Sequence, residues 1–520
     1  MKLKILNKWF VWGSIGLLFL FTRLYQINTN PPALYWDEAS IGVNAYSILI
    51  TGKDEWGTSF PLHFRAFGEF KLPVYIYTVA GFMSVLGKKE IAVRLPAVLF
   101  TAIAILFSFL IYRKVLGSQL ATLGVFFLTM TPWLFLFSRT GYEVTAGLAF
   151  FMAGLFFFLK SLEQTSKVDF GHFLLAHLFF GLALYSYNSY RVILPVALPL
   201  FYIYLWRSVG LTKTKLKAIF LSLFLISLMM IPVLRLLFSP EGLNRYQAVG
   251  AVDLNHKRET IYNLSRNYFK NFSPQFLGLS GDSNSRSHTQ FGGELLWVEI
   301  FLGLSGLIYI ARGSFKKNWL FLGLLLISPL PVAITKESPH ALRGLTMIPF
   351  LVVLALLGMK GLISLVHSQK PLIGAVLLGS FFQFSLYYLD FENNYSKFAP
   401  DWQYGYSQVF KNYGQSFANY KHVYISDYMA QPYIFYLFYG DLDYASFRKN
   451  IQYSPPSDWG FSTVRSIGNV EFIKGLEGLN LMSSLVFASQ QQRLDNVDST
   501  DVLSNPDGSV AFYVYDFTKK

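Results

Sequence analysis

Long apolar runs recur along most of the chain up to about residue 390, and short polar connections separate them. A helix needs roughly 20 apolar residues to cross the hydrocarbon core of a bilayer, which is about 30 Å thick. Runs close to that length predict eleven transmembrane helices, over residues 9–27, 91–112, 118–137, 143–162, 169–187, 191–206, 216–237, 294–311, 318–335, 342–366 and 371–389. The expected fold class is therefore an all-α polytopic membrane protein.

A shorter apolar run, residues 71–86, decides on which side of the membrane every later loop lies. Cytoplasmic loops of membrane proteins carry an excess of lysine and arginine. If residues 71–86 do not cross, the inner side holds most basic residues of the short connections, namely Lys2, Lys4, Lys8, Arg113, Lys114, Lys160, Lys167, Arg207, Lys213, Lys215, Lys217, Arg312, Lys316, Lys317 and Lys370. If they cross, the bias reverses. We therefore predict an interfacial or re-entrant helix there, a cytoplasmic N-terminus and an extracytoplasmic C-terminus at the cell membrane.

The tail of the chain has a different pattern from the apolar runs. Apolar-rich stretches at 422–426, 483–489 and 510–517 alternate with a helix-like stretch at 431–439, which predicts a small α/β domain. We expect two domains: a transmembrane catalytic domain over residues 1–390, and an extracytoplasmic α/β domain over 391–520. The predicted topology also places two long loops of the first domain, 28–90 and 239–293, on the outer face.

Composition agrees with the membrane prediction. Hydrophobic residues make up 53% of the 520 positions and charged residues only 14%, against roughly a quarter in soluble domains. The net charge of +14 fits basic cytoplasmic loops and anionic lipid better than nucleic acid. The chain has no cysteine, which excludes disulfides, thiolate nucleophiles and cysteine-ligated metal centres.

The first outer loop carries two adjacent carboxylates, Asp37 and Glu38, after two prolines and an aromatic pair. They can cap the helix that follows, or one of them can act in catalysis, and the residues alone leave both readings open. Lys71 begins the interfacial helix of the same loop. The interpretation of Lys71 that requires no function is a side chain that reaches the polar headgroups.

Further ionisable residues are predicted to face the same outer side. Each is an ordinary loop charge taken alone: Arg94, Arg139, Glu143, Arg286, His340 and Arg343. Carboxylates beside several cations at the depth of the lipid headgroups suit the handling of a phosphate-bearing lipid.

The order of these motifs resembles that of a known group of enzymes. Tyr35 to Glu38, followed by Gly42, Ala45 and Gly52, resembles the acidic first-loop motif of the GT-C superfamily. Lys71 to Tyr75 is similar to the lysine–proline–proline–leucine–tyrosine element of its protein O-mannosyltransferase and aminoarabinose transferase branch. The segments 93–97, 138–143 and 339–343 follow in the order of that branch. Two departures are that Leu72 replaces the first proline and that Glu143 replaces the usual aspartate.

The resemblance implies the GT-C fold and an inverting glycosyltransferase. Such an enzyme moves a sugar from a polyprenyl-phosphate carrier to a protein, lipid or polysaccharide acceptor on the outer face. Asp37 is then the expected base, with Glu38 orienting the acceptor or supporting Asp37. The expected substrate-binding residues are Lys71 and Arg343 first, as ligands of the lipid phosphate, and then Arg94, Arg139, Glu143, Arg286 and His340.

No cofactor is expected. Some GT-C enzymes use a divalent metal, but the branch resembled here generally works without one. The pair Asp441 and Asp443 has the spacing seen in metal-dependent glycosyltransferases, yet it lies in the tail, where we expect a surface turn.

Two alternative functions belong to other classes. A transporter or lipid flippase would need ionisable residues near the middle of the membrane and repeated halves. Here the deep ionisable residue is His177, for which we expect a hydrogen bond between helices, and no internal repeat is visible. A polysaccharide polymerase or ligase is expected to lack the Asp37 and Glu38 pair directly after the first helix.

Overall fold

The computed structural model describes residues 8–67, 69–163, 169–209, 213–239, 250–251, 255–455, 463–495 and 497–518. It separates into two compact units, each described by itself below. The helical unit comprises residues 1–25, 97–237 and 246–391. The mixed unit comprises residues 26–96, 238–245 and 392–520.

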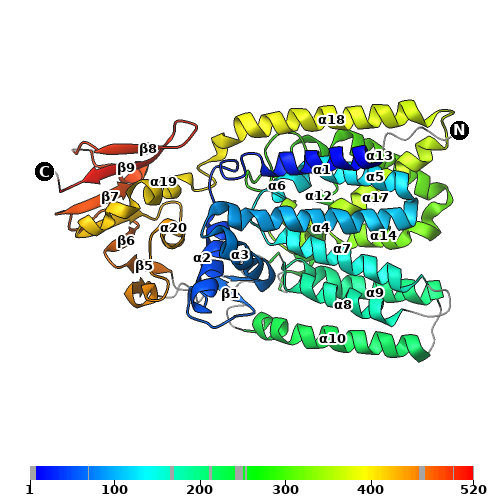
Figure 1. Cartoon of the computed structure of the whole chain (residues 1–520), viewed down its shortest axis with the longest axis horizontal. Coiled ribbons are helices and arrows are strands. Elements are labelled where there is room, and N and C mark those ends of the chain that lie inside the picture. Colours follow the sequence, from blue (N-terminus) through cyan, green and yellow to red (C-terminus); the bar gives the residue numbers. More distant parts are fainter. Residues whose placement is uncertain are drawn as a thin grey trace. The chain divides into compact units, whose positions relative to one another are not determined.

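Helices occupy most of every apolar run predicted to cross the membrane, which confirms the fold class, although the runs 118–137 and 318–335 are each divided into two helices. The helices of the helical unit, which run side by side in Figure 1, are α1 (Lys8–Leu24), α4 (Glu90–Leu116, from residue 97 on), α5 (Ser118–Met130), α6 (Pro132–Phe137), α7 (Val144–Ser161), α8 (Phe170–Leu184), α9 (Tyr190–Val209), α10 (Lys213–Leu237), α12 (Lys257–Lys270), α13 (Trp297–Tyr309), α14 (Phe315–Ile327), α15 (Leu330–Ala333), α16 (Ala341–Gly344), α17 (Ile348–Ile363) and α18 (Gln369–Asn394). Within the described residues, five helical segments are long and apolar enough to span a bilayer by themselves: Glu90–Leu116, Val144–Ser161, Ile219–Leu237, Ala341–Ile363 and Gln369–Phe398.

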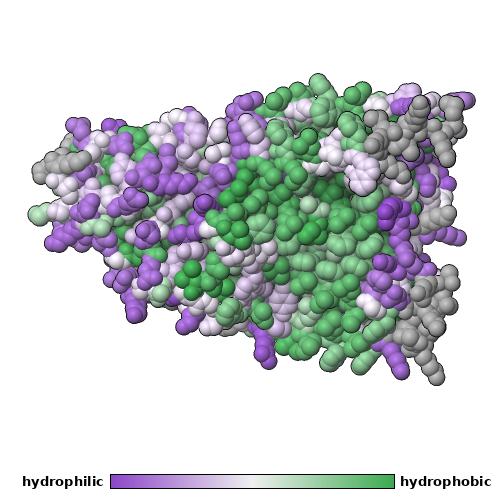
Figure 2. Space-filling model, in the orientation of Figure 1, coloured by the Kyte–Doolittle hydropathy of each residue, from purple (hydrophilic) through white to green (hydrophobic). Residues whose placement is uncertain are grey.

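The helical unit packs through small residues and exposes apolar ones. A β-carbon added to Gly306 of α13 would lie 2.0 Å from the carbonyl oxygen of Leu354, and one added to Gly358 of α17 would lie 1.9 Å from that of Leu302. The two helices therefore touch backbone to backbone, as small residues permit in membranes. Large apolar side chains of α10 and α18 stay exposed, and Figure 2 shows the apolar surface that such side chains form. That surface is suited to lipid.

His177 lies between two helices of this unit. Its Nδ1 is 2.8 Å from the carbonyl oxygen of Phe173 on α8, and its Nε2 is 3.2 Å from the hydroxyl of Tyr202 on α9. The predicted interhelical contact is confirmed.

The mixed unit combines the first outer loop with the tail. From the loop come α2 (Trp36–Thr51), the hairpin β1 (Phe64–Ala66) and β2 (Glu69–Lys71), α3 (Pro73–Leu86) and the first turns of α4. From the tail come α19 (Tyr404–Tyr413), β3 (His422–Ser426), α20 (Pro432–Tyr439), β4 (Ile451–Tyr453), β5 (Val464–Ile467), β6 (Val470–Ile473), β7 (Ser484–Ala488), β8 (Asp501–Ser504) and β9 (Val510–Asp516). The apolar pattern does not anticipate this grouping, and the domain boundary near residue 390 stays a prediction.

The tail contains the predicted α/β arrangement. Its strands form one sheet in the order β4-β5-β6-β3-β7-β9-β8, in which β3 pairs in parallel with β6 and β7. The three predicted strands are β3, β7 and β9, and the predicted helix is α20. Asp443 lies in an exposed turn, where its Oδ1 accepts a hydrogen bond of 2.9 Å from the backbone N–H of Ala445.

Local sequence fixes the ends of the two elements that carry the first-loop motifs. Gly52 ends α2 with a φ of 68°, a left-handed conformation that favours glycine. Pro73 is the first residue of α3, where its missing N–H removes no helical hydrogen bond. Asp37 consequently lies in the first turn of α2, and Lys71 is the last residue of the hairpin.

Candidate functional site

An ion pair joins the start of α2 to the end of the hairpin. Lys71 donates a 2.6 Å hydrogen bond from Nζ to Oδ1 of Asp37. The lysine side chain is 4% exposed and the aspartate side chain 25%. Among the described residues, no hydrogen bond or ion pair is made with Oδ2 of Asp37. The carboxylate is therefore held by one oxygen while the other remains available to a substrate.

Glu38, the neighbour of Asp37, is fully buried and has both oxygens engaged. Its Oε2 accepts from the backbone N–H of Tyr35 at 3.1 Å, and the guanidinium of Arg94 donates to Oε1 at 3.2 Å and to Oε2 at 3.3 Å. Glu38 thus holds the first turn of α2 from within the protein. Of its two expected roles, the geometry favours support of Asp37.

Arg94, near the start of α4, is fully buried, and its N–H groups are all used. Besides its contacts with Glu38, Nη1 donates to the carbonyl oxygens of Ile27 at 2.7 Å and Pro31 at 2.9 Å, and Nη2 donates to that of Ala33 at 2.5 Å. These bonds tie residues 27–33 to Glu38 through one guanidinium. The expected contact of Arg94 with the carrier lipid stays a prediction.

Three of the other expected residues gather in the helical unit. Arg343 on α16 donates from Nη1 to Oγ1 of Thr335 at 3.0 Å, and its Nη2 lies 3.4 Å from Oε2 of Glu337. Its side chain is 22% exposed. Nδ1 of His340 lies 3.4 Å from Oδ2 of Asp282, and the charge of Arg286 acts on the same imidazole.

Electrostatics in this cluster favour the neutral form of the His340 imidazole. Burial, followed by the charges of Arg343 and Arg286, lowers the pKa of His340 to about 3. Burial also raises the pKa of Asp282, although the backbone N–H groups of Asn284 and Ala341 bind this carboxylate. The cluster therefore offers an anionic ligand two arginines and a neutral histidine.

Arg139 and Glu143 lie elsewhere in the helical unit. Arg139 is fully buried, donates to the backbone carbonyls of Thr22 and Tyr25, and lies over the ring of Phe391 at 5.1 Å. These contacts secure the end of α1, and the expected contact of Arg139 with substrate stays a prediction. Glu143 directly precedes α7, and its part in binding substrate stays a prediction.

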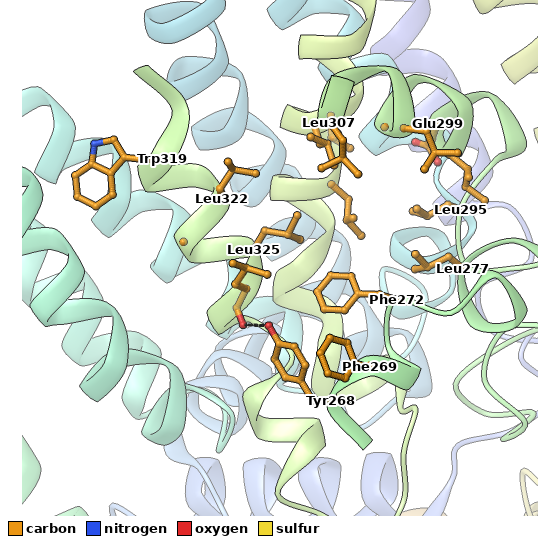
Figure 3. A pocket seen from close by; sticks show the side chains of 18 of the residues that line it. Tyr268, Phe269, Phe272, Leu277, Leu295, Glu299, Leu307, Trp319, Leu322 and Leu325 are labelled. Carbon is orange, nitrogen blue, oxygen red and sulfur yellow. Dashed lines mark hydrogen bonds between the residues drawn. The ribbon is translucent and has the colours of Figure 1, made fainter. Parts of the chain in front are cut away.

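A deep apolar pocket of about 770 Å³ lies inside the helical unit (Figure 3). Helices α9, α12, α13, α14 and α17 supply most of its lining, and the segment between α12 and α13 supplies Phe272, Leu277 and Leu295. The lining residues from the helices are Leu200, Arg207, Tyr268, Phe269, Glu299, Ile300, Gly303, Leu304, Leu307, Trp319, Leu322, Gly323, Leu325, Leu326, Leu351, Val352 and Leu354. Tyr268 of α12 donates to the carbonyl of Leu326 on α14 at 2.8 Å.

Helix α12 links this pocket to the arginine cluster. Asn267, beside the pocket residue Tyr268, donates to the carbonyl of Thr335 at 2.9 Å, and the hydroxyl of Thr335 binds Arg343. Lys270, at the end of α12, lies 3.4 Å from the carbonyl of Ser338. Helix α12 therefore contributes residues to the pocket and also holds the loop that carries the cationic cluster.

One buried carboxylate of the mixed unit was not anticipated from the sequence. Glu55 is 3% exposed, and its backbone N–H donates to Oδ1 of Asn44 at 3.0 Å. Burial raises its pKa to about 8, while the hydrogen bond from Asn44 and the charge of Lys71 oppose that shift. Lys71 therefore acts on both Asp37 and Glu55. The acidic pair Asp54 and Glu55, just after the turn that ends α2, was the available sequence cue.

Comparisons with known proteins support one fold. Residues 71–234 match the family model described as dolichyl-phosphate-mannose-protein mannosyltransferase. No curated protein sequence matches the chain. The structure is similar to that of ArnT from Cupriavidus metallidurans bound to undecaprenyl phosphate, with a TM-score of 0.58 and 12% identity over 98% of both chains. The apo form of that protein gives 0.52 and 12% identity over 84% of this chain and 86% of that one.

An archaeal protein has a similar fold. The oligosaccharyltransferase of Archaeoglobus fulgidus in its apo form gives a TM-score of 0.52 and 13% identity, over 83% of this chain and 64% of that one. At such low identities the likeness concerns the fold. The family match covers the segment from Lys71 into α10.

Proposed function

We propose that the chain is a membrane glycosyltransferase of the GT-C superfamily, and that it transfers a sugar from a polyprenyl-phosphate donor to an acceptor on the outer face of the membrane. Support comes from the matched family model and the shared fold. The main structural observation behind the proposal is the Asp37 and Lys71 pair. Asp37 has one carboxylate oxygen held by Lys71 and one available, and it lies in the segment that resembles the acidic first-loop motif of that superfamily.

The proposed reaction is a single displacement with inversion at the anomeric carbon. An acceptor hydroxyl or amine attacks that carbon, and Oδ2 of Asp37 takes its proton. The new bond forms on the side opposite the carrier, while the bond between the anomeric carbon and the phosphate oxygen breaks. The leaving phosphate keeps that electron pair. Glu38 and Arg94 fix the first turn of α2 from inside, so that Asp37 keeps its position.

The leaving group needs cations, because negative charge develops on the carrier phosphate as the bond breaks. We assign this role to Lys71 and Arg343, with Arg286 and the neutral His340 as further contacts. Arginine suits a phosphate because its planar N–H groups match two oxygens at once. No metal or other cofactor enters the proposed mechanism.

The apolar pocket fits the prenyl part of the donor. Ligand pockets typically enclose about 300–1,000 Å³, and the volume of about 770 Å³ lies within that range. Its walls are leucine, isoleucine and aromatic side chains, and helix α12 connects it to Arg343. The polar head and the apolar tail of one lipid thus have adjacent sites on the helical unit.

The experiment that tests the function is an assay of the purified chain with a panel of polyprenyl-phosphate sugars and mixed acceptors. Release of free polyprenyl phosphate together with a glycosylated acceptor is the expected result. If no sugar is released while labelled carrier moves between the leaflets of proteoliposomes, the chain is a flippase and the proposal is overturned.

Replacing Arg343 with alanine is expected to weaken carrier binding and slow turnover. A hydrogen bond to a charged group contributes roughly 1.5–3 kcal/mol, and Arg343→Lys should restore only part of it. Binding of polyprenyl phosphate and initial rates provide the measurement. Arg266→Ala, which changes an exposed arginine of α12, is the matched control. Equal carrier affinity in the two variants would remove Arg343 from the proposed site.

We also propose a cytoplasmic N-terminus and an extracytoplasmic tail at the cell membrane, on the charge bias of the connections. Cysteines introduced at the exposed positions Ser283 and Gln491 are expected to react with an impermeant thiol reagent in intact cells, because both then lie outside. A cysteine at the exposed Ser118 should react only after lysis. The reverse labelling pattern would contradict the orientation and the shared outer site.

A further inference from the structure

Three residues around the starts of helices α19 and α20 carry a β-carbon and yet have left-handed backbone conformations. The φ angle is 55° at Gln403, 63° at Ala430 and 56° at Gln431. Such conformations are unfavourable for these residue types and persist where the surrounding structure holds them, often at functional sites. Gln403 directly precedes α19, and the other two directly precede α20. The buried side chain of Gln403 lies where these segments meet.

The amide of Gln403 joins that meeting point to the first outer loop. Its Nε2 donates to the carbonyl oxygens of Met429 and Ala430, the latter at 3.0 Å. Its Oε1 accepts from the backbone N–H of Trp36 at 3.1 Å. The two amide hydrogens of this side chain therefore bind the carbonyls of the strained loop. Its amide oxygen binds Trp36, the first residue of α2 and the neighbour of Asp37.

The bond from Trp36 to Gln403 gives the first N–H group of α2 a hydrogen-bond acceptor. The first N–H groups of a helix have no partner within it and are usually satisfied by a nearby serine, threonine, asparagine or aspartate. The residue before α2 is Tyr35, whose side chain makes no capping hydrogen bond. The acceptor for Trp36 comes instead from a residue 367 positions away in the sequence.

We propose that Gln403 is a positioning residue for Asp37, through which the tail fixes the geometry of the site. This inference rests on the proposed function, because it gives Asp37 the role of base. Arg94 and Glu38 hold the turn of α2 from one side, and Gln403 holds it from the other. The tail is then part of the catalytic apparatus rather than an appended domain.

Other contacts keep the loop and the tail together when Gln403 is changed. Glu90 accepts hydrogen bonds from Lys411 at 2.8 Å and from Tyr439 at 2.6 Å. Arg448 donates to the hydroxyl of Ser47 at 2.8 Å and to the carbonyl of Asp54 at 2.6 Å. A variant at position 403 can therefore lose its three bonds without separating these segments.

The test uses the full chain with Gln403→Gly. Glycine adopts the left-handed conformation without strain, so the fold is expected to be kept while the amide is removed. A displacement of about 1 Å at a reacting group can cost on the order of 10²-fold in rate. We expect kcat to fall by about that factor, with the KM for the carrier within about twofold and a cooperative melting transition that is lowered by only a few degrees, since the lost hydrogen bonds are partly offset by the relieved backbone strain.

Two further variants sharpen the comparison. Gln403→Glu keeps an acceptor for Trp36 and should retain more activity than the glycine variant. Gln408→Ala, which loses a 3.2 Å bond to the carbonyl of Ser504 within the tail, should behave as wild type. Wild-type turnover of Gln403→Gly overturns the proposal. A parallel loss of melting temperature, carrier affinity and rate also overturns it, because the residue is then merely structural.

Failure of the proposed function can be told apart from failure of this inference. If the wild-type chain transfers no sugar, the function itself fails, and the catalytic role of Gln403 fails with it. Hydrogen exchange at the backbone N–H of Trp36 is an independent readout of the bond. Exchange is expected to accelerate in Gln403→Gly and to stay unchanged in Gln408→Ala. Unchanged exchange in both variants overturns the inference whatever the activity.

Discussion

Asp37→Asn is expected to lower turnover by about 10²–10⁴-fold, the range for the loss of a general base. Asparagine can still accept hydrogen bonds at a helix start and can still accept one from Lys71. The cost in stability should therefore be at most about 1 kcal/mol. Carrier binding is expected to stay near the wild-type level, because the phosphate ligands are unchanged. Sugar transfer, donor binding and thermal unfolding, measured in detergent, check these three expectations.

The controls for this prediction separate a base from a helix cap. Asp441→Asn, at an exposed position of the tail, should have no effect on any of the three measurements. Glu38→Gln should lower stability, because it leaves the buried guanidinium of Arg94 without a negative partner. Near-normal turnover of Asp37→Asn would show that Asp37 caps α2 and that another group takes the proton.

Arg94→Ala is expected to destabilise the chain by roughly 3–5 kcal/mol, the range for removing one partner of a buried ion pair. The variant would leave Glu38 as an unpaired buried charge and three carbonyl oxygens without their donor. Arg94→Lys should recover little, since an ammonium has three donors in place of five and lacks the planar geometry. Thermal or denaturant unfolding provides the measurement.

A double variant tests whether the loss comes from the unpaired charge. Arg94→Leu combined with Glu38→Leu should be more stable than Arg94→Ala alone, because no buried charge is left without a partner. Arg113→Ala, at an exposed position of α4, is the control and should leave stability unchanged. Wild-type stability of Arg94→Ala would contradict the structural role of these bonds.

The membrane helices and three strands of the sheet, β3, β7 and β9, could be predicted from apolar patterning. Strands β3 and β7 are almost wholly buried, so their runs of apolar residues stand out. Strands β4, β5, β6 and β8 were missed. Strands β5 and β6 are only four residues long, whereas β4 and β8 have mostly exposed or half-buried residues and pair on one side only, at an edge of the sheet. Edge strands need no continuous apolar face, so they leave little trace in the pattern.

The candidate site was only partly predictable for a related reason. Motif order led to the Asp37 and Lys71 pair, but a charged residue near the end of a span looks the same whether it meets a substrate or is buried. Arg94 and Arg343 were therefore given similar roles, although the first has all its donors engaged and the second is partly exposed. Gln403 had no sequence cue, because its partner lies far away along the chain.

The contact between Gly306 and Gly358 sets the spacing of two helices that line the apolar pocket. Because α13 and α17 touch through their backbones, their spacing cannot shrink, and a larger side chain at either glycine would push the two helices apart. Both helices contribute side chains to the pocket, although neither glycine is among the lining residues. The room that the pocket offers a ligand, between these helices and the pair α12 and α14 joined by Tyr268 (Figure 3), is therefore governed in part by two residues that no ligand would touch.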